Sequence, residues 1–385
     1  MPKPRPKSAD DINDLLALIK AGRLFEVQAW IADGNRVRDP SNEHAKFCPL
    51  YQSVEVGFHS LVQVVLTATE WAQDEKDDAL NAAMSNRRLD LVDLLLASGA
   101  QASAINFSDV CQTVDTGLME RFLRLGVDPA KDNAFARSLD DIKARPLLGF
   151  YRSFRHEFPS LHPQASLALV EAVEQKKHRW AALLAWAGAD PFMQVPESLY
   201  HGWEFEDYNG RSAAEKACWS EDGELVKALK LRPTSEQAQE LLRRAGWFPC
   251  VAVFEQLLRV LPKEQLNVTE RRSCVAVEQI VERHNYDFLG SAREQQKDDS
   301  AVASLEFLLD HGARWNPEPG RLSSIRRTLA KHSANYIIRV LRLLLYTAGA
   351  AEESALRELC RTPVLRDKIA SMDKPLAQEF ATKFK

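Results

Sequence analysis

The feature that most constrains this chain is a recurring pair of short helical segments that ends at a glycine. The clearest copy is residues 80–100, LNAAMSNRRLDLVDLLLASGA. A first helix carries Ala82 and Ala83, a polar break covers residues 86–88, and a more apolar second helix runs up to Gly99. Glycine is favoured at such a position because it adopts the left-handed conformation that closes a helix. We therefore predict two helices joined by a tight turn.

The same order of features recurs along the chain. It is found in residues 16–34, 50–69, 110–129, 169–191 and 305–316. Gly126 and Gly188 are 62 residues apart, and Gly188 and Gly312 are 124 apart, which are two and four times 31. One helix pair of about 33 residues cannot bury its apolar faces alone, so neighbouring pairs must stack. The pattern predicts an all-α repeat protein.

The turns after the second helices resemble those of the ankyrin-repeat family. The resemblance rests on Gly188-Ala189-Asp190-Pro191, on Gly126-Val127-Asp128-Pro129, and on Asn209 to Ala214 with Leu225-Val226. It covers much of residues 12–350 and is clearest over 77–130 and 166–232. The family's Thr-Pro-Leu-His tetrapeptide is missing, and Ser212-Ala213-Ala214-Glu215 is its nearest relative.

This resemblance implies an all-α, ankyrin-type helical repeat solenoid: one curved, right-handed array of about ten helix pairs. Repeats in the middle and near the C-terminus are degenerate. Residues 132–165, 236–283 and 320–352 keep helix pairs without the signature, so a different helical-hairpin repeat remains an alternative there. We expect a disordered N-terminal lead over residues 1–9, the array over 10–352, and a C-terminal helical cap over 353–385.

Composition narrows the function only slightly. Of the 385 residues, 45% are hydrophobic and 27% charged, and the net charge is −4, so no global charge favours nucleic acid or an anionic membrane. The six cysteines form no C-x-x-C pair, and no secretory signal opens the chain. The apolar run at 336–346 is far shorter than the roughly 20 residues that span a bilayer. We expect a cytoplasmic monomer without a membrane segment.

A long spacer over residues 192–208 is the first candidate binding site. Aromatic side chains in a polar, acidic loop are typical of interface hot spots, and the carboxylates would favour a basic partner. The alternative is that the rings fold back onto adjacent helices. A second spacer covers residues 285–300 and is also expected to be a loop. The predicted partner-binding residues are Tyr200, Trp203, Glu204, Phe205, Glu206, Asp207 and Tyr208.

A basic run near the C-terminus is the second candidate site. Clustered arginines can neutralise a nucleic-acid backbone, and Arg327 with His332 fits a loose pattern of some helical ribonucleases. Apolar residues alternate with the basic ones, however, which favours a solvated helix face over a phosphate-binding stripe. The run comprises Arg321, Arg326, Arg327, Lys331, Arg339 and Arg342.

Known catalytic patterns are missing from the sequence. His156 and His162 lack the spacing that places two imidazoles on one helix face, and Pro159 lies between them. There is no glycine-rich phosphate loop, no G-x-S-x-G elbow and no kinase-like motif set. We therefore expect no catalytic residues, no metal and no cofactor, and a protein that is not an enzyme.

The tryptophans fall into two groups. Trp30, Trp180 and Trp186 lie on repeat helices, where packing is the expected role. The other group lies near helix starts or turns, where side chains could face a groove; it comprises Trp219, Trp247 and Trp315.

Protein recognition is the function that the family resemblance implies. The chain would act as a scaffold or adaptor that binds a protein partner through its concave face and loop tips. Two narrower alternatives stay open: an antidote or inhibitor of a toxin or effector, and a helical ribonuclease or nucleic-acid-binding protein that uses Arg321 to Arg342.

Overall fold

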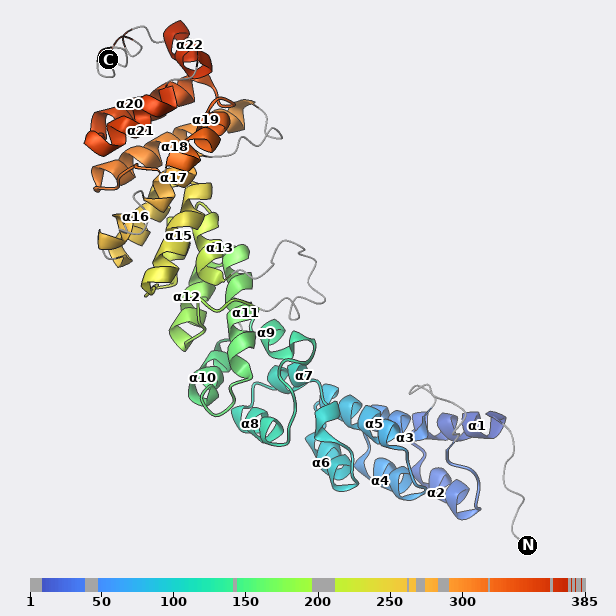
Figure 1. The fold of residues 1–385 in the computed structure, drawn as a ribbon. Helices are drawn as coiled ribbons and strands as arrows, with labels where there is room; N and C mark the ends of the chain where they lie inside the picture. Colours follow the sequence, from blue (N-terminus) through green and yellow to red (C-terminus); the bar gives the residue numbers. More distant parts are fainter. Residues whose placement is uncertain are drawn as a thin grey trace. The chain divides into compact units, whose positions relative to one another are not determined.

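The fold is entirely helical in the part of the chain that the computed structural model describes (Figure 1), as the sequence predicts. None of these residues forms a strand. They divide into two compact units, residues 1–165 and 166–385, which are treated separately below. The described residues are 9–38, 48–140, 144–195, 212–261, 263–267, 274–282, 291–317, 319–360, 363–372, 375, 378 and 382.

The first unit is built from short helices joined by tight turns. None of the described helices of the chain is long and apolar enough to cross a membrane. The α-helices of this unit are α1 (Ala9–Lys20), α2 (Leu24–Ala32), α3 (Pro49–Val56), α4 (His59–Thr67), α5 (Gln73–Ser85), α6 (Leu89–Ala97), α7 (Phe107–Gln112), α8 (Thr116–Arg124), α9 (Ala134–Ser138) and α10 (Arg145–Phe154), with 3-10 turns η2 (Ala102–Ala104) and η3 (Lys131–Asn133). Helix α11 (Leu161–Glu174) spans the boundary between the units.

Helices in the first unit pack in two rows. In one row, α1 contacts α3, α3 contacts α5, α5 contacts α7, and α7 contacts α9; in the other, α2 contacts α4 and α4 contacts α6. Within each pair the two helices also touch, as in α1 with α2 and α5 with α6. Fully buried side chains such as Leu50, Leu80 and Phe107 fill the space between neighbours. Each helix pair is thus buried mainly against the pair before it and the pair after it.

The second unit repeats this arrangement. Helices α13, α15 and α17 form one row, and α12, α14, α16, α18, α20 and α22 form the other. Its helices are α12 (His178–Ala187), α13 (Ala213–Trp219), α14 (Gly223–Ala228), α15 (Ser235–Trp247), α16 (Val251–Val260), η7 (Lys263–Asn267), α17 (Val275–Val281), α18 (Ser291–Asp310), η8 (Pro319–Arg321), α19 (Leu322–Leu329), α20 (Ala334–Thr347), α21 (Ala350–Cys360) and α22 (Pro363–Met372).

Two glycines let neighbouring helices of the second unit approach closely. A Cβ added to Gly223, at the start of α14, would lie 2.4 Å from the backbone oxygen of Ala252 in α16. A Cβ added to Gly246, near the end of α15, would lie 2.7 Å from the Cβ of Gln279 in α17. Such distances leave no room for a larger side chain. These contacts fix the spacing between successive helix pairs.

One backbone turn recurs in six hairpins of the described residues. In each, the residue two positions before the second helix has a positive φ, which is the left-handed conformation. Only two of these positions hold glycine, although the left-handed conformation is strained for other residues. The six residues are Gly22, Gly57, Arg87, Val114, Lys176 and Glu221.

The glycines that the sequence places after the second helices behave as predicted. Gly34, Gly99, Gly126, Gly188 and Gly312 all have φ between 72° and 103°. The polar break at residues 86–88 also lies where expected, between the end of α5 and the start of α6.

Some expectations need correction. Residues 291–300 of the second spacer belong to helix α18, so that part is not a loop. Trp186, for which packing is the expected role, is 55% exposed; of the three tryptophans near helix starts or turns, Trp315 is only 2% exposed and does not face a groove. Both errors arise because periodicity alone gives helix boundaries and facing directions only approximately.

We predict that replacing Val114 by glycine stabilises the first unit by about 1 kcal/mol, because valine is strained at φ 59°. Val114 is 47% exposed, so little packing is lost. The matched control is Gly126→Ala at φ 88°, where the added Cβ meets nothing within 4 Å and only backbone strain is introduced. Chemical denaturation should show opposite shifts for the two variants; shifts of the same sign would contradict the assigned turn.

Candidate protein-binding surface

Residues 196–208 of the aromatic and acidic spacer predicted to bind a partner lie outside the described residues. The prediction for Tyr200, Trp203, Glu204, Phe205, Glu206, Asp207 and Tyr208 therefore stays a prediction. The last described residue before this stretch is Val195 and the first after it is Ser212, and both are 1% exposed. Ser212 caps helix α13 by accepting a hydrogen bond from the backbone N–H of Glu215 at 3.3 Å.

Two adjacent charged residues of α13 are buried. Glu215 is 7% exposed and Lys216 is 6% exposed. Lys216 Nζ lies 3.2 Å from Glu174 Oε2 at the end of α11. Glu215 accepts a hydrogen bond from Gln194 Nε2 at 2.6 Å. Buried charges are tolerated only when they are paired in this way, so both side chains are held in fixed positions.

The chain of charges continues onto α15. Glu215 Oε2 lies 3.6 Å from Arg244 Nη2, and Arg244 Nε lies 2.7 Å from Glu240 Oε1. Arg243 Nε also donates to Glu240, at 2.7 Å. Burial acts to raise the pKa of the Glu240 carboxyl, but hydrogen bonds and positive charge from both arginines outweigh it and hold that pKa below its usual value. Glu240 is therefore ionised at neutral pH and fixes both guanidinium groups.

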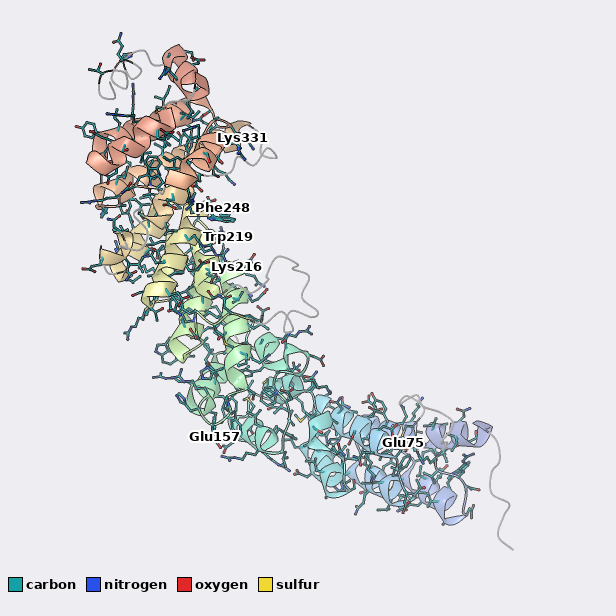
Figure 2. The ribbon with its side chains drawn as sticks, in the orientation of Figure 1. Glu75, Glu157, Lys216, Trp219, Phe248 and Lys331 are labelled. Carbon is teal, nitrogen blue, oxygen red and sulfur yellow. The ribbon has the colours of Figure 1, made fainter. Side chains whose placement is uncertain are left out.

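Aromatic rings gather where α13 and α15 end, and we call Trp219, Trp247 and Phe248 the aromatic ledge. The Trp219 and Trp247 ring centroids are 6.3 Å apart, and Trp219 meets Phe248 edge to face at 5.2 Å. Trp247 is 36% exposed, and the other two rings are partly exposed. Figure 2 shows Trp219 and Phe248 close to Lys216, on the same side of the second unit.

Cations cover the ledge. The Arg244 guanidinium lies 5.9 Å from the Trp219 ring centroid, Arg243 lies 5.9 Å from the Trp247 ring, and Lys297 Nζ lies 5.4 Å from the Phe248 ring. Tryptophan and arginine held rigidly side by side are the residue types most often found at interface hot spots. The ledge is therefore the best-defined candidate binding surface among the described residues. The sequence placed both tryptophans near turns but did not show that they meet.

The basic run is not a free cationic stripe. Arg321 forms ion pairs with Glu278 and Glu282, the second at 2.7 Å. Arg339 pairs with Asp299, and Arg326 Nη2 donates to the carbonyl of Glu358 at 2.6 Å. The apolar residues between these cations are buried, as a solvated amphipathic face requires; they are Ile325, Leu329, Ile337, Ile338, Leu341 and Leu345.

The histidines predicted to be unsuitable for zinc serve as packing partners. Tyr151 Oη lies 3.0 Å from His162 Nδ1, and the His156 and His162 rings meet edge to face at 6.5 Å. In the part of the chain that the structure describes, His, Cys, Asp and Glu side chains form no group that could hold a metal.

The thiols are poorly suited to nucleophilic chemistry. Burial raises the pKa of Cys48 and of Cys274 to about 11, and the pKa of Cys111 and of Cys360 to about 12. Burial also raises the pKa of Cys218 far above its usual value. Because the thiolate is the reactive form, these groups are inert at neutral pH.

We predict that Arg321→Ala lowers the free energy of unfolding by about 2 kcal/mol, because it leaves the buried Glu278 without its cation. Arg327 is exposed and makes no ion pair with any residue that the structure describes, so Arg327→Ala should change stability by less than about 0.5 kcal/mol. Urea denaturation of both variants measures the difference. Equal effects would mean that Arg321 does not hold α17.

We also predict that iodoacetamide at pH 8 modifies Cys250 before the other cysteines of the folded protein. Cys250 is partly exposed, whereas Cys48, Cys111, Cys218 and Cys274 are buried. Peptide mass spectrometry would locate the label, and Cys250→Ser should remove most of the native-state signal. Rapid labelling of Cys111 in the folded protein would contradict the assigned burial.

No protein-family model matches the chain, and no curated protein is found to be similar to it.

Proposed function

We propose that this chain is an ankyrin-type helical repeat protein that works by binding another protein and catalyses no reaction. The observation that supports the repeat assignment is the recurring left-handed turn two residues before the second helix, present in both units. Glycine caps after the second helices and contacts between equivalent helices of successive pairs support it further. A stack of this kind offers an extended surface with prearranged side chains.

The aromatic ledge is the proposed contact surface in the second unit. Its rings are partly exposed, and the arginines beside them are held by Glu215 and Glu240. Side chains that are already ordered lose little conformational entropy when a partner binds. The acidic spacer with Trp203 and Tyr208 remains part of the proposal and would favour a basic region of the partner.

A scaffold or adaptor is the role that this proposal favours. The ion pairs of Arg321, Arg326 and Arg339 argue against a nucleic-acid site on the basic run, because a phosphate would have to compete with carboxylates already in place. The raised pKa values of the buried thiols argue against cysteine catalysis. No observation selects the antidote or inhibitor role over the adaptor role.

We predict that the tagged chain recovers a partner protein from host extract. Trp247→Ala and Lys297→Glu should each lower the recovered amount of that protein by about tenfold or more. The second variant reverses a surface charge without removing core volume. Trp186→Ala is the matched control, since Trp186 is 55% exposed in the same unit but at the end of α12. Quantitative mass spectrometry of the bound fraction, with melting curves for each variant, measures the effect.

The proposal fails if the same proteins are recovered with all variants and with the untagged control. Recovery of RNA that disappears in Arg327→Ala would support the nucleic-acid alternative instead. The variants Trp203→Ala and Tyr208→Ala test the spacer in the same experiment.

A further inference from the structure

Three successive hairpin turns of the first unit expose large apolar side chains to solvent. Phe25 is 82% exposed, Phe58 is 59% exposed and Leu89 is 38% exposed. Phe25 is the second residue of α2, Phe58 precedes α4, and Leu89 begins α6. We call these residues, together with Lys20 and Arg87, the turn ridge. Exposed phenylalanines grouped in this way usually mark an interaction site.

The three turns stack on one another, so the exposed residues form one surface. The ring of Phe58 lies against Gly22 in the preceding turn, where an added Cβ would come within 2.8 Å of the ring. In the same way, the Arg88 guanidinium donates a hydrogen bond to the carbonyl of Gly57 in the turn before it. Each turn therefore touches the next, and the ridge runs along all three.

The N-cap residues of these three helices are not of the types that stabilise the start of a helix. The N-cap positions of α2, α4 and α6 are Arg23, Phe58 and Arg88, and none accepts a side-chain capping bond. In α8 the N-cap is Asp115, which accepts hydrogen bonds from Gly117 and Leu118. A Ser, Thr, Asp or Asn cap contributes about 1 kcal/mol. The first three positions therefore hold exposed apolar and basic side chains at a cost in stability.

On and beside the ridge, the cations Lys20, Arg23, Arg87 and Arg88 outnumber the carboxylates Glu26, Glu55 and Asp90, so the net charge is positive. Glu26 is paired with Arg23, and Asp90 lies 2.7 Å from Arg88. Glu55, at the end of α3, accepts a hydrogen bond from Asn86 Nδ2 at 2.9 Å. Lys20 and Arg87 are exposed, and neither pairs with a carboxylate of the residues that the structure describes. A partner that fits this surface must supply apolar side chains to the rings and carboxylates to these two cations.

We propose that the turn ridge binds a segment of a partner protein in which apolar side chains alternate with aspartate or glutamate. This inference rests on the proposed protein-binding function and names the chemistry of one partner segment. A second copy of the chain fits less well, because a symmetric contact between two ridges would bring together two surfaces of the same net charge.

The test is selection of a displayed library of random 16-residue peptides on the full-length protein, followed by fluorescence anisotropy with synthetic copies of the enriched sequences. The expected clones are rich in Asp or Glu together with Leu, Phe or Trp. Their affinity should fall about tenfold or more in Phe25→Ala and in Arg87→Glu, and should fall as salt is raised. Phe25 is so exposed that its removal should leave the melting temperature unchanged.

Leu125→Ala is the matched control, because Leu125 is 47% exposed in the same unit but follows the C-terminal end of α8. No enrichment, or clones that bind Phe25→Ala and Arg87→Glu as tightly as wild type, would overturn the inference. A concentration-dependent dimer in sedimentation that Phe25→Ala abolishes would assign the ridge to a second copy. Binding to phosphatidylserine vesicles without peptide binding would assign it to a membrane.

This experiment separates two failures. If the wild-type protein enriches no peptide, or if the ridge variants bind the peptides as tightly as wild type, while a host protein still depends on Trp247, only the ridge inference falls. If no host protein depends on Trp247 but acidic peptides bind the ridge, the ledge is not the contact surface and the ridge inference stands.

Discussion

Burial of each helix pair against its neighbours is the interaction on which the rest of the structure depends. The contacts link α1 to α3 to α5 in the first unit and α13 to α15 to α17 in the second. At Gly246 the approach is so close that the backbone of α15 nearly touches α17. Because each pair is stabilised locally, no single interior dictates the sequence of the whole chain. The sides of the helices that face no neighbour are therefore available for recognition.

The same local stabilisation explains how the repeats have diverged. Arg87, Val114, Lys176 and Glu221 stand where glycine would be relaxed, yet the backbone keeps the left-handed turn. Strain of this kind persists only where surrounding contacts determine the conformation. At Glu221 the neighbouring pair supplies such a contact, because Cys250 Sγ donates a hydrogen bond to the Glu221 carbonyl. The left-handed turn is thus kept although the residue at this position varies.

The sequence predicted the features that depend on neighbouring residues, but it did not predict contacts between residues far apart in the chain. Helix pairs, glycine caps and the break at residues 86–88 follow from local rules, and these predictions were confirmed. The pairing of Arg321 with Glu278 joins residues 43 positions apart, which no periodicity reveals. The aromatic ledge was missed for the same reason: Trp219 and Trp247 meet only because α13 packs on α15. The one available signal was that each lies near a predicted helix start or turn.

The two candidate surfaces differ in whether their cations are already paired with carboxylates, and they should therefore bind a partner in different ways. At the ledge, the arginines are already committed to Glu215 and Glu240, so they orient the rings and add little net charge. At the ridge, Lys20 and Arg87 pair with no carboxylate in the described part of the chain and can attract one from outside. Recognition at the ledge should therefore depend mainly on shape and apolar contact and respond weakly to salt. Recognition at the ridge should depend on salt, because exposed charges are screened over about 10 Å at 0.1 M ionic strength.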